Sequence, residues 1–555
     1  MLLFQLGYSF ETGDQLQYLL LPYRELFTAF LPGDWFTWHT SHYHVSFSWL
    51  VQTVHALTGP AWFARGMFAV HFANLGWFGI AVWRLAFALG LGPLEASGCV
   101  AVLALIRQVA LAGALVNHAG LVPADLALAP FLLACAAYGE RRNLAMGAWL
   151  GISGLLHANY AVLGPLVLFP LVVWRERHEL RVRTWVGPIA SYVGLASPSL
   201  WLLLGTFLAR DASPQAVSIT LFVRSPHHYD LASMRPDEWY FAAVLTTLGA
   251  GHFLAWSRAR PVTCSLAHVQ LTAALFACVA LAVVGSGLHI VPLARLFAWR
   301  MSVPLYVSLL LAAAAILRAR VRARDLTGSS TMLIGYGVLL TFAQRDPLEA
   351  SPWNAEPTLA GCVVALLIAA RVAEHMLSGR LRTSICILAS VVAVALALRA
   401  TLPANSVGPE LWSRLHLLDA RVAIDPPVRN LFTAIRQRTP NDARFLIAPG
   451  QSQFRMHARR AVFVDWKCAP MKGDEALEWK RRMLLTMRVS EFPAKGYSLP
   501  HAADRLYYAR PLNELAQLAR AEGLTHVLAR RSNPKRPDSG LRQVFSLGDY
   551  IVLAL

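Results

Sequence analysis

Residues 265–286, SLAHVQLTAALFACVALAVVGS, contain no aspartate, glutamate, lysine or arginine. A helix of about 20 predominantly apolar residues spans the hydrocarbon core of a bilayer, and this stretch has that length. We therefore interpret it as a membrane-spanning helix and apply the same criterion to the rest of the chain.

The composition of the whole chain agrees with this interpretation. Of its 555 residues, 56% are hydrophobic and only 15% are charged, and the mean hydropathy is +0.45. A soluble globular domain is usually about 25% charged. The formal net charge of +18 comes largely from short loops between apolar runs, which indicates membrane topology and argues against a nucleic-acid partner. We predict an α-helical polytopic membrane bundle.

Apolar runs of suitable length recur along the first 403 residues. The start, residues 1–10, is apolar but short, and we expect it to be the outer tip of a first helix that is truncated in this chain. We expect about 12 segments, at about 66–89, 97–116, 119–138, 144–157, 159–174, 185–209, 239–256, 265–286, 301–317, 331–343, 358–377 and 384–402.

Lysine and arginine are concentrated in alternate loops, and such loops usually face the cytoplasm. This predicts an integral membrane protein whose basic loops lie in the cytoplasm. The first outer loop, residues 9–60, and the tail after residue 402 then lie on the extracytoplasmic side. The basic loops are residues 140–142, 175–183, 257–260, 318–324 and 379–382.

The chain changes character after the membrane bundle of residues 1–403. From residue 410 to 555, charged residues are distributed throughout, and alternating segments predict a small α/β extracytoplasmic domain. The predicted strands are 444–448, 461–465, 525–529, 543–547 and 550–553, and the predicted helices are 427–437, 474–486 and 512–522.

Three carboxylates of the first outer loop are candidates for catalysis: Glu11, Asp14 and Asp34. A carboxylate at a membrane surface can act as a general base or bind a divalent cation. Each aspartate also has a structural interpretation, because Asp14 precedes a helix start and Asp34 follows Pro-Gly in a turn. The sequence leaves both interpretations open.

Imidazole and amide groups are predicted on the same side. His42 lies in a stretch with three histidines, which could ligate metal, lie at the interface or contact a polar substrate. His118, His157 and Asn159 lie at predicted helix turns, where polar groups usually face a cavity or a partner. We predict substrate contacts for these four residues.

Arg295 and Arg300 lie among apolar residues just before a predicted helix. Positive charge on the outer side runs against the usual bias, and a guanidinium fork suits a lipid phosphate or diphosphate. The alternative is that each side chain snorkels to lipid headgroups. We predict a phosphate contact, with Arg300 the stronger candidate.

Several short motifs resemble the GT-C superfamily of membrane glycosyltransferases and, more narrowly, an uncharacterised bacterial family of GT-C-like membrane proteins. The resemblance covers nearly the whole chain as an architecture. The motifs are Gly13-Asp14-Gln15, Leu31-Pro32-Gly33-Asp34-Trp35 and Gly154-Leu155-Leu156-His157, together with residues 439–449, 454–455 and 461–467 of the tail.

The resemblance implies transfer of a sugar from a polyprenyl-phosphate carrier to an acceptor at the outer face of the membrane. It further implies that Asp14 is the base or a metal ligand, for Mg²⁺ or Mn²⁺, assisted by Glu11 or Asp34. Arg300 would then contact the phosphate of the lipid-linked donor. The identity of the acceptor is left open.

Two other classes of function remain compatible with the sequence. One is a transporter or flippase for a lipid or a polyanion, and the other is a non-catalytic membrane assembly protein that docks through its tail. The geometry of the folded chain distinguishes them from a transferase, for which Asp14, His157 and Arg300 should gather at one outward-facing cavity.

Overall fold

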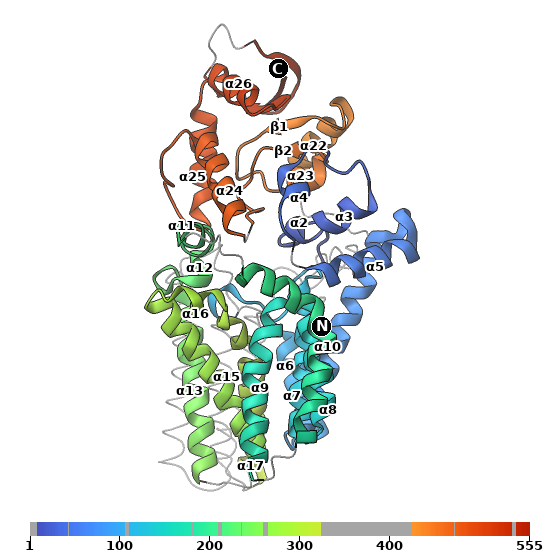
Figure 1. The fold of residues 1–555 in the computed structure, drawn as a ribbon, viewed down its shortest axis with the longest axis vertical. Helices are drawn as coiled ribbons and strands as arrows, with labels where there is room; N and C mark the ends of the chain where they lie inside the picture. Colours follow the sequence, from blue (N-terminus) through green and yellow to red (C-terminus); the bar gives the residue numbers. More distant parts are fainter. Residues whose placement is uncertain are drawn as a thin grey trace, which may run out of the picture.

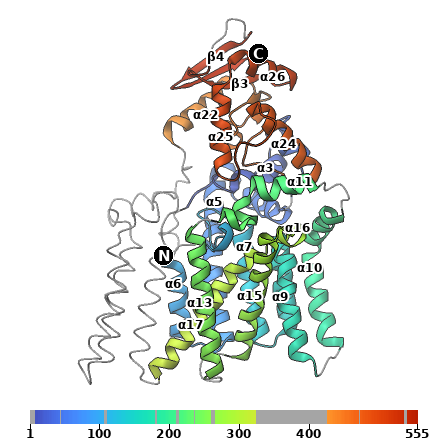
Figure 2. The ribbon, with the colours of Figure 1, turned by 90° about the vertical axis from the view of Figure 1, so that its left-hand side faces the viewer.

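A computed structural model gives the fold. It describes residues 8–42, 44–105, 110–178, 182–208, 214–234, 236–258, 265–322, 425–470, 472–534 and 540–555. Long helices lie side by side at one end of the molecule, and residues 425–555, which we call the C-terminal region, lie at the other (Figures 1 and 2).

The chain is an integral membrane protein. In the described part of the chain, five segments are long and apolar enough to cross a bilayer. They belong to α5 (Val45–Ala88), α9 (Ala158–Glu176), α10 (Val182–Leu208), α15 (Leu266–Gly287) and the stretch Ala298–Ala319, which includes most of α17 (Ser302–Arg322). The bundle also contains α6 (Pro93–Leu105), α7 (Pro123–Gly139), α8 (Asn143–Leu156) and α13 (Pro236–Arg258).

Most predicted helices of the bundle are present, but the predicted helix 97–116 is wrong in its second half. The observed α6 ends at Leu105, and η1 (Leu111–Gly113) is a short turn that includes Ala112 at φ 54°. Side chains satisfy its backbone, since Ser302 Oγ accepts from Leu111 N and Glu238 Oε1 accepts from Gly113 N. Non-helical backbone at such a depth is tolerated where protein surrounds it. The predicted segments 331–343, 358–377 and 384–402 and the tip at 1–7 lie outside the described residues.

The first outer loop is more ordered than the sequence suggested. It forms α2 (Gln15–Tyr18), α3 (Leu20–Leu26), α4 (Trp35–His39) and the first turns of α5, which bends at Gly59, where φ is 69°, just before Pro60. Aromatic and aliphatic residues, including Leu19 and Phe36, bury one side of these short helices. The segment therefore packs as a layer between the bundle and the C-terminal region.

Short elements also cap the end of the bundle that faces the C-terminal region. They are α11 (Pro214–Ser218), η2 (Ile219–Arg224), α12 (Pro226–Tyr229), η3 (Leu231–Ser233), α16 (Val291–Arg295) and η4 (Ala298–Met301). The element η2 is a π-helix, a form that often occurs at functional sites.

The C-terminal region contains a five-stranded sheet in the order β2-β1-β3-β5-β4. Parallel pairing joins β1 to β2 and β3, whereas β5 pairs antiparallel with β3 and β4. The strands are β1 (Arg444–Leu446), β2 (Ala461–Val462), β3 (His526–Arg530), β4 (Arg542–Leu547) and β5 (Tyr550–Ala554). The helices are α22 (Pro426–Arg438), α23 (Phe454–Ala458), α24 (Gly473–Met487), α25 (Ser498–Ala509) and α26 (Leu512–Ala521).

Alternating side chains of the strands bury both faces of this sheet. Phe445 and Ile447 pack with α22 and α23, whereas Leu446 and Ala448 pack with α24, α25 and α26 on the opposite face. This period of two is the signature of a strand. The five predicted strands and three predicted helices all have counterparts here, and α23 and α25 are additional.

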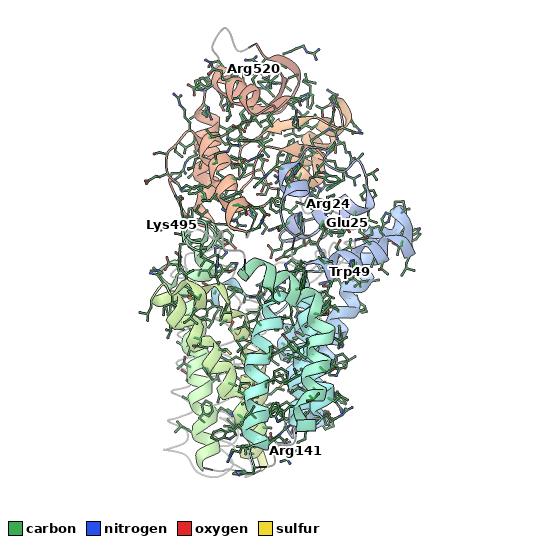
Figure 3. The ribbon with its side chains drawn as sticks, in the orientation of Figure 1. Arg24, Glu25, Trp49, Arg141, Lys495 and Arg520 are labelled. Carbon is green, nitrogen blue, oxygen red and sulfur yellow. The ribbon has the colours of Figure 1, made fainter. Side chains whose placement is uncertain are left out.

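The predicted basic loop at Arg141 lies at the end of the bundle away from the C-terminal region. Figure 3 places Arg141 at one extreme of the molecule and Arg520 of the C-terminal region at the other. The helices of the bundle lie between the basic loop at Arg141 and the C-terminal region.

Candidate functional site

Residues 9–60, the predicted first outer loop, are called the first outer segment from here on. A cavity of about 320 Å³ lies where the bundle, the first outer segment and the C-terminal region meet. Five of the predicted site residues line it: His42, His157, Asn159, Arg295 and Arg300. Other lining residues are Gln17, Tyr18, Leu21, Phe36, Ser41, His44, Ala158, Leu203, Ala216, Val217, Thr220, Leu221, His228, Tyr229, Phe297, Pro470 and Gly473.

The side chain of Arg300 has no hydrogen bond or ion pair among the described residues, and its Nε is buried. Its guanidinium lies 5.2 Å from the ring centroid of Phe297. Phe297 itself has φ 48°, a conformation that is strained for a bulky side chain. The chain thus accepts local strain beside a half-buried guanidinium that has no carboxylate partner among the described residues.

Two predicted residues fix the start of α9 beside this cation. The His157 ring caps α9 by accepting from the backbone N–H of Asn159, at 3.2 Å from Nδ1. The Asn159 amide donates to the Leu296 carbonyl at 3.1 Å and so connects α9 to the segment that carries Arg300. His157 and Asn159 therefore hold the cavity wall in place.

The imidazoles of the cavity are kept neutral. Burial lowers the pKa of His42 to about 4, and burial together with the charge of Arg300 lowers the pKa of His44 and of His228 to about 4. Burial and Arg300 also lower the pKa of His157. At neutral pH these rings add hydrogen-bonding capacity to the cavity without adding positive charge.

Asp14 does not line the cavity, but it lies one helical turn before the lining residue Tyr18, and its charge acts on the lining residues His44 and His228. Lys467 of the C-terminal region donates a hydrogen bond to Asp14 Oδ1, and His118 Nε2 lies 3.9 Å from Asp14 Oδ2. Burial raises the pKa of Asp14, but the charges of Lys467 and His118 outweigh it and hold this pKa below its ordinary value. Asp14 is therefore an ionised carboxylate, and its side chain is 42% exposed.

His118 lies between two carboxylates. Its Nδ1 is 2.7 Å from Asp125 Oδ1, and Asp125 Oδ2 accepts from the His118 backbone N–H at 2.9 Å. Burial lowers the pKa of His118, but Asp125 and Asp14 raise it above its ordinary value. The predicted residue His118 therefore orients Asp14 and does not line the cavity.

The other two predicted carboxylates have structural partners. Glu11 accepts a hydrogen bond from Tyr23 Oη at 2.6 Å, its backbone carbonyl lies 3.0 Å from His457 Nε2, and burial raises its pKa. Asp34 is fully buried and caps α4 by accepting from Thr37 N at 2.9 Å. Neither residue lines the cavity, so the geometry gives each a positioning role.

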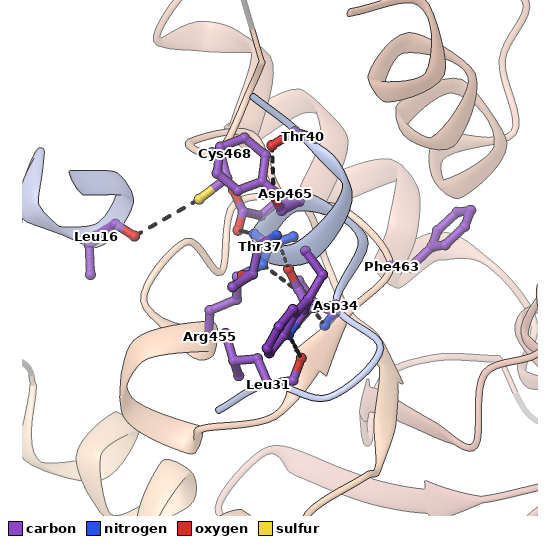
Figure 4. A network of polar contacts seen from close by, with 12 residues as sticks. Leu16, Leu31, Asp34, Thr37, Thr40, Arg455, Phe463, Asp465 and Cys468 are labelled. Carbon is purple, nitrogen blue, oxygen red and sulfur yellow. Dashed lines mark hydrogen bonds and ion pairs between the residues drawn. The ribbon is translucent and has the colours of Figure 1, made fainter. Parts of the chain in front are cut away.

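Asp34 belongs to a buried network that joins the first outer segment to the C-terminal region (Figure 4). Arg455 Nε donates to Asp34 Oδ2 at 2.8 Å, and Val462 N donates to the same oxygen at 3.0 Å. Arg455 also pairs with Asp465, whose other oxygen accepts from Cys468 N at 2.7 Å. Because Asp465 lies two residues before Lys467, this network fixes the segment that delivers Lys467 to Asp14.

Sequence reasoning did not identify Lys467, Arg455 or Asp465 as site residues. All three occur in the tail motifs that carry the resemblance, but no spacing in the sequence indicates a contact with residues more than 400 positions away. Only the folded chain brings Asp14 and Lys467, 453 residues apart, into contact.

The residues around Asp14 do not fit a divalent cation. Within the described residues, no group of three or more histidine, cysteine, aspartate or glutamate side chains is arranged to hold a metal ion. The Asp14 carboxylate already binds the Lys467 ammonium, and a cation held by a single carboxylate would lack the oxygen ligands that Mg²⁺ requires. We therefore assign no chemical step to a metal.

A family model described as a domain of unknown function, DUF6798, matches residues 427–485. This segment contains Arg455, Asp465 and Lys467. No curated protein matches the chain by sequence.

The structure is similar to two solved membrane enzymes. One is ArnT from Cupriavidus metallidurans bound to undecaprenyl phosphate, with 14% identity, a TM-score of 0.48, and coverage of 99% of this chain and 95% of ArnT. The other is the Archaeoglobus fulgidus oligosaccharyltransferase tethered to an acceptor peptide, with 12% identity, a TM-score of 0.46, and coverage of 95% of this chain and 65% of that one.

Proposed function

We propose that this protein is a membrane glycosyltransferase that transfers a sugar from a polyprenyl-phosphate-type lipid carrier to an acceptor at the extracytoplasmic face. The single observation that carries the proposal is the cavity lined by the half-buried Arg300, which has no anionic partner among the described residues, with the ionised carboxylate of Asp14 close enough to act on the lining residues His44 and His228. The Nε of Arg300 is buried without a hydrogen bond, which is costly, and a phosphate ligand would relieve that cost.

The arrangement suits the two charges that develop during glycosyl transfer. The bond from the sugar C1 to an oxygen of the carrier phosphate breaks, and a bond from C1 to the acceptor oxygen forms. The carrier leaves as a phosphate monoester, which takes up the proton of the acceptor hydroxyl. Arg300, with Arg295 beside it, would stabilise the leaving phosphate. Asp14 would stabilise the positive charge that builds on the sugar ring.

Asp14 is better suited to electrostatic stabilisation than to strong base catalysis. A general base works best when its pKa lies near the operating pH, whereas Lys467 and His118 lower that of Asp14. We assign Asp14 a further part in accepting a hydrogen bond from the acceptor hydroxyl and so directing its oxygen towards C1. Lys467 then holds the carboxylate in place and keeps it ionised.

The proposed sidedness places the cavity and the C-terminal region, as an α/β domain, outside the cytoplasm of a bacterial inner membrane. Arg141 and the C-terminal region lie at opposite ends of the bundle (Figure 3), which agrees with a cytoplasmic basic loop. Alkaline phosphatase fused after Leu555 should therefore be active. Activity only in a fusion at Arg141 would reverse the proposed topology.

The test is turnover of polyprenyl-phosphate sugars by the purified full-length protein. We expect wild-type protein to release polyprenyl phosphate and Asp14→Asn to lose at least about 100-fold in kcat, the scale of removing one electrostatic contact in a transition state. Glu25→Gln is the matched control, because Glu25 is an exposed carboxylate of the same outer segment.

Two outcomes would contradict the proposal. Full activity of Asp14→Asn would remove Asp14 from the mechanism. Tight binding of the lipid-linked donors without turnover of any would instead favour a transporter or flippase.

A further inference from the structure

A second pocket, of about 490 Å³, lies between the first outer segment and the C-terminal region. Helix α4 separates it from the cavity: Phe36 of α4 lines the cavity, whereas Trp35 and His39 line the second pocket. The complete lining is Gly33, Trp35, His39, Arg444, Ala461, Val462, Phe463, Arg482, Glu522 and Leu524. Its volume falls within the range of about 300–1,000 Å³ that is usual for small-molecule sites.

Arg444 is an exposed residue that lines the pocket and supplies positive charge to it. Among the described residues, no carboxylate lies within ion-pair distance of its guanidinium. The stem of Arg444 passes over Gly33, where an added Cβ would lie 3.3 Å from Arg444 Cδ. Gly33 also has φ +76°, so the turn before Asp34 needs a glycine for its backbone and for the close passage of Arg444.

The other charged groups of the pocket are already paired. Arg482 Nε lies 2.7 Å from Glu478 Oε1, and its guanidinium is 4.6 Å from the ring centroid of Trp35. Glu522 is paired with Arg481 at 2.7 Å. The opposite charges within each of these pairs cancel. The positive charge of Arg444 is therefore in surplus and makes the pocket suited to an anion.

We propose that this pocket binds an anionic saccharide, a sugar that carries a phosphate or a carboxylate, as part of the acceptor. The guanidinium of Arg444 would bind the anionic group through two hydrogen bonds, and Trp35 offers an apolar surface next to the sugar ring. The choice of a saccharide, and its assignment to the acceptor, rest on the function proposed above. The anion preference rests on the pocket itself.

The lining of the pocket assigns it to the acceptor and not to the lipid-linked donor. All its lining residues come from the first outer segment and the C-terminal region, and none comes from the spanning helices. A donor anchored by a polyprenyl chain has to approach from the bilayer, which the first cavity allows through residues at the ends of α8, α9 and α10. An acceptor could approach the second pocket from the side of the C-terminal region.

The experiment measures binding of glucose 6-phosphate, glucose and inorganic phosphate to the purified full-length protein by titration calorimetry. We expect glucose 6-phosphate to bind wild type, inorganic phosphate to bind more weakly, and glucose to bind least. Arg444→Ala should weaken glucose 6-phosphate binding at least tenfold, and Arg444→Lys should weaken it less. The control is Arg505→Ala, because Arg505 is an exposed arginine on α25 away from the pocket.

A Trp35→Leu variant separates sugar recognition from simple anion binding. It should reduce the preference for glucose 6-phosphate over inorganic phosphate, while inorganic phosphate binds as before. Equal affinity of wild type and Arg444→Ala for glucose 6-phosphate would overturn the proposal. Equal affinity of wild type for glucose 6-phosphate and inorganic phosphate would reduce the pocket to an anion site.

The proposed transferase function and the proposed second pocket can be tested independently of each other. Asp14→Asn should bind glucose 6-phosphate as wild type does, because Asp14 is not part of this pocket. If no donor is turned over but Arg444-dependent binding persists, the transferase proposal fails and the pocket stands. If transfer proceeds and Arg444→Ala binds glucose 6-phosphate normally, the pocket proposal alone fails.

Discussion

Arg455 and Arg300 both lie where the first outer segment meets another part of the protein, but Arg455 is buried, whereas Arg300 is half-buried and lines the cavity. Arg455 is 2% exposed and pairs with two buried carboxylates, Asp34 and Asp465. Arg300 has no carboxylate partner among the described residues, and its Nε is buried without a hydrogen bond. A saturated guanidinium fixes structure, whereas an unsatisfied one leaves room for a ligand.

The largest expected effect on stability comes from replacing Arg455, whose guanidinium is paired with two carboxylates. Arg455→Ala should lower the free energy of unfolding by about 3–5 kcal/mol, because it leaves two carboxylates buried without their counter-charge. Thermal unfolding of the purified protein measures this, with Arg505→Ala as an exposed arginine control. An unchanged unfolding midpoint in Arg455→Ala would mean that the network does not hold the C-terminal region to the first outer segment.

Replacing Arg300 should have the opposite result: activity should fall while stability is kept. Arg300→Gln should lower transfer activity about 100-fold, the effect of losing one contact to a developing charge. Its thermal stability should be close to that of wild type, because no hydrogen bond or ion pair is lost and only the contact with the Phe297 ring is removed. The comparison fails if Arg300→Gln unfolds as readily as Arg455→Ala, since Arg300 would then have a structural role.

A similar contrast separates the two aspartates that the sequence presented as equivalent. Both follow glycine in the first outer loop. Asp14, which precedes a predicted helix start, occupies the N-cap position of α2 without a side-chain cap, whereas Asp34, which the sequence placed in a turn, caps α4. What local sequence could not reveal is the partner from the tail: Arg455 saturates Asp34, whereas Lys467 leaves Asp14 partly exposed. The periodicity of apolar residues was enough for most helices and for all five strands, because burial follows from local pattern.

The same reasoning explains the parts that the sequence did not predict. The break after Leu105 depends on bonds from Leu111 and Gly113 to Ser302 and Glu238, which are distant in the chain. Arg300, His157 and Asn159 were identified because polar groups among apolar residues are costly without a purpose. Lys467 carried no such signal, since charged residues are ordinary in the tail.

Acidification should destabilise the region around Arg300, because the histidines that line its cavity resist protonation in the folded protein. His42, His44 and His228 have pKa values of about 4 in the folded protein, below the ordinary value of 6.5. The unfolded chain therefore takes up protons first, and stability should fall as the pH falls from about 6.5 towards 4. The fall should be smaller in His44→Gln, measured as the unfolding midpoint at pH 7.5, 6 and 5.

His118 should show the opposite pH dependence. Its pKa is raised by Asp125 and Asp14, so its contribution is complete below the unfolded value and is lost as the pH rises through its folded value. His118→Gln should therefore reduce stability more at pH 6 than at pH 9. A loss that grows towards alkaline pH would contradict the ion pairs with Asp125 and Asp14.

The smallest expected effect concerns a peripheral contact between the same two regions. Ser41 donates its hydroxyl and its backbone N–H to Glu475 Oε1 at 2.8 and 3.0 Å. Ser41→Ala removes only the hydroxyl, so the free energy of unfolding should fall by about 1 kcal/mol. A loss as large as that of Arg455→Ala would show that the contact between the regions does not depend mainly on the Arg455 network.

The pairing of Asp14 with Lys467 has a consequence for the growing chain. Because the two residues are 453 positions apart, a ribosome that has made the first outer segment and the entire bundle has still not made the counter-charge of Asp14. The carboxylate acquires its final surroundings only after residue 467 has been synthesised and the C-terminal region has docked. A protein truncated between the C-terminal region's first residue, 425, and residue 466 would keep the five spanning segments, which end at Ala319, yet it would lack the counter-charge of Asp14, so such incomplete chains would lie in the membrane with an unfinished site.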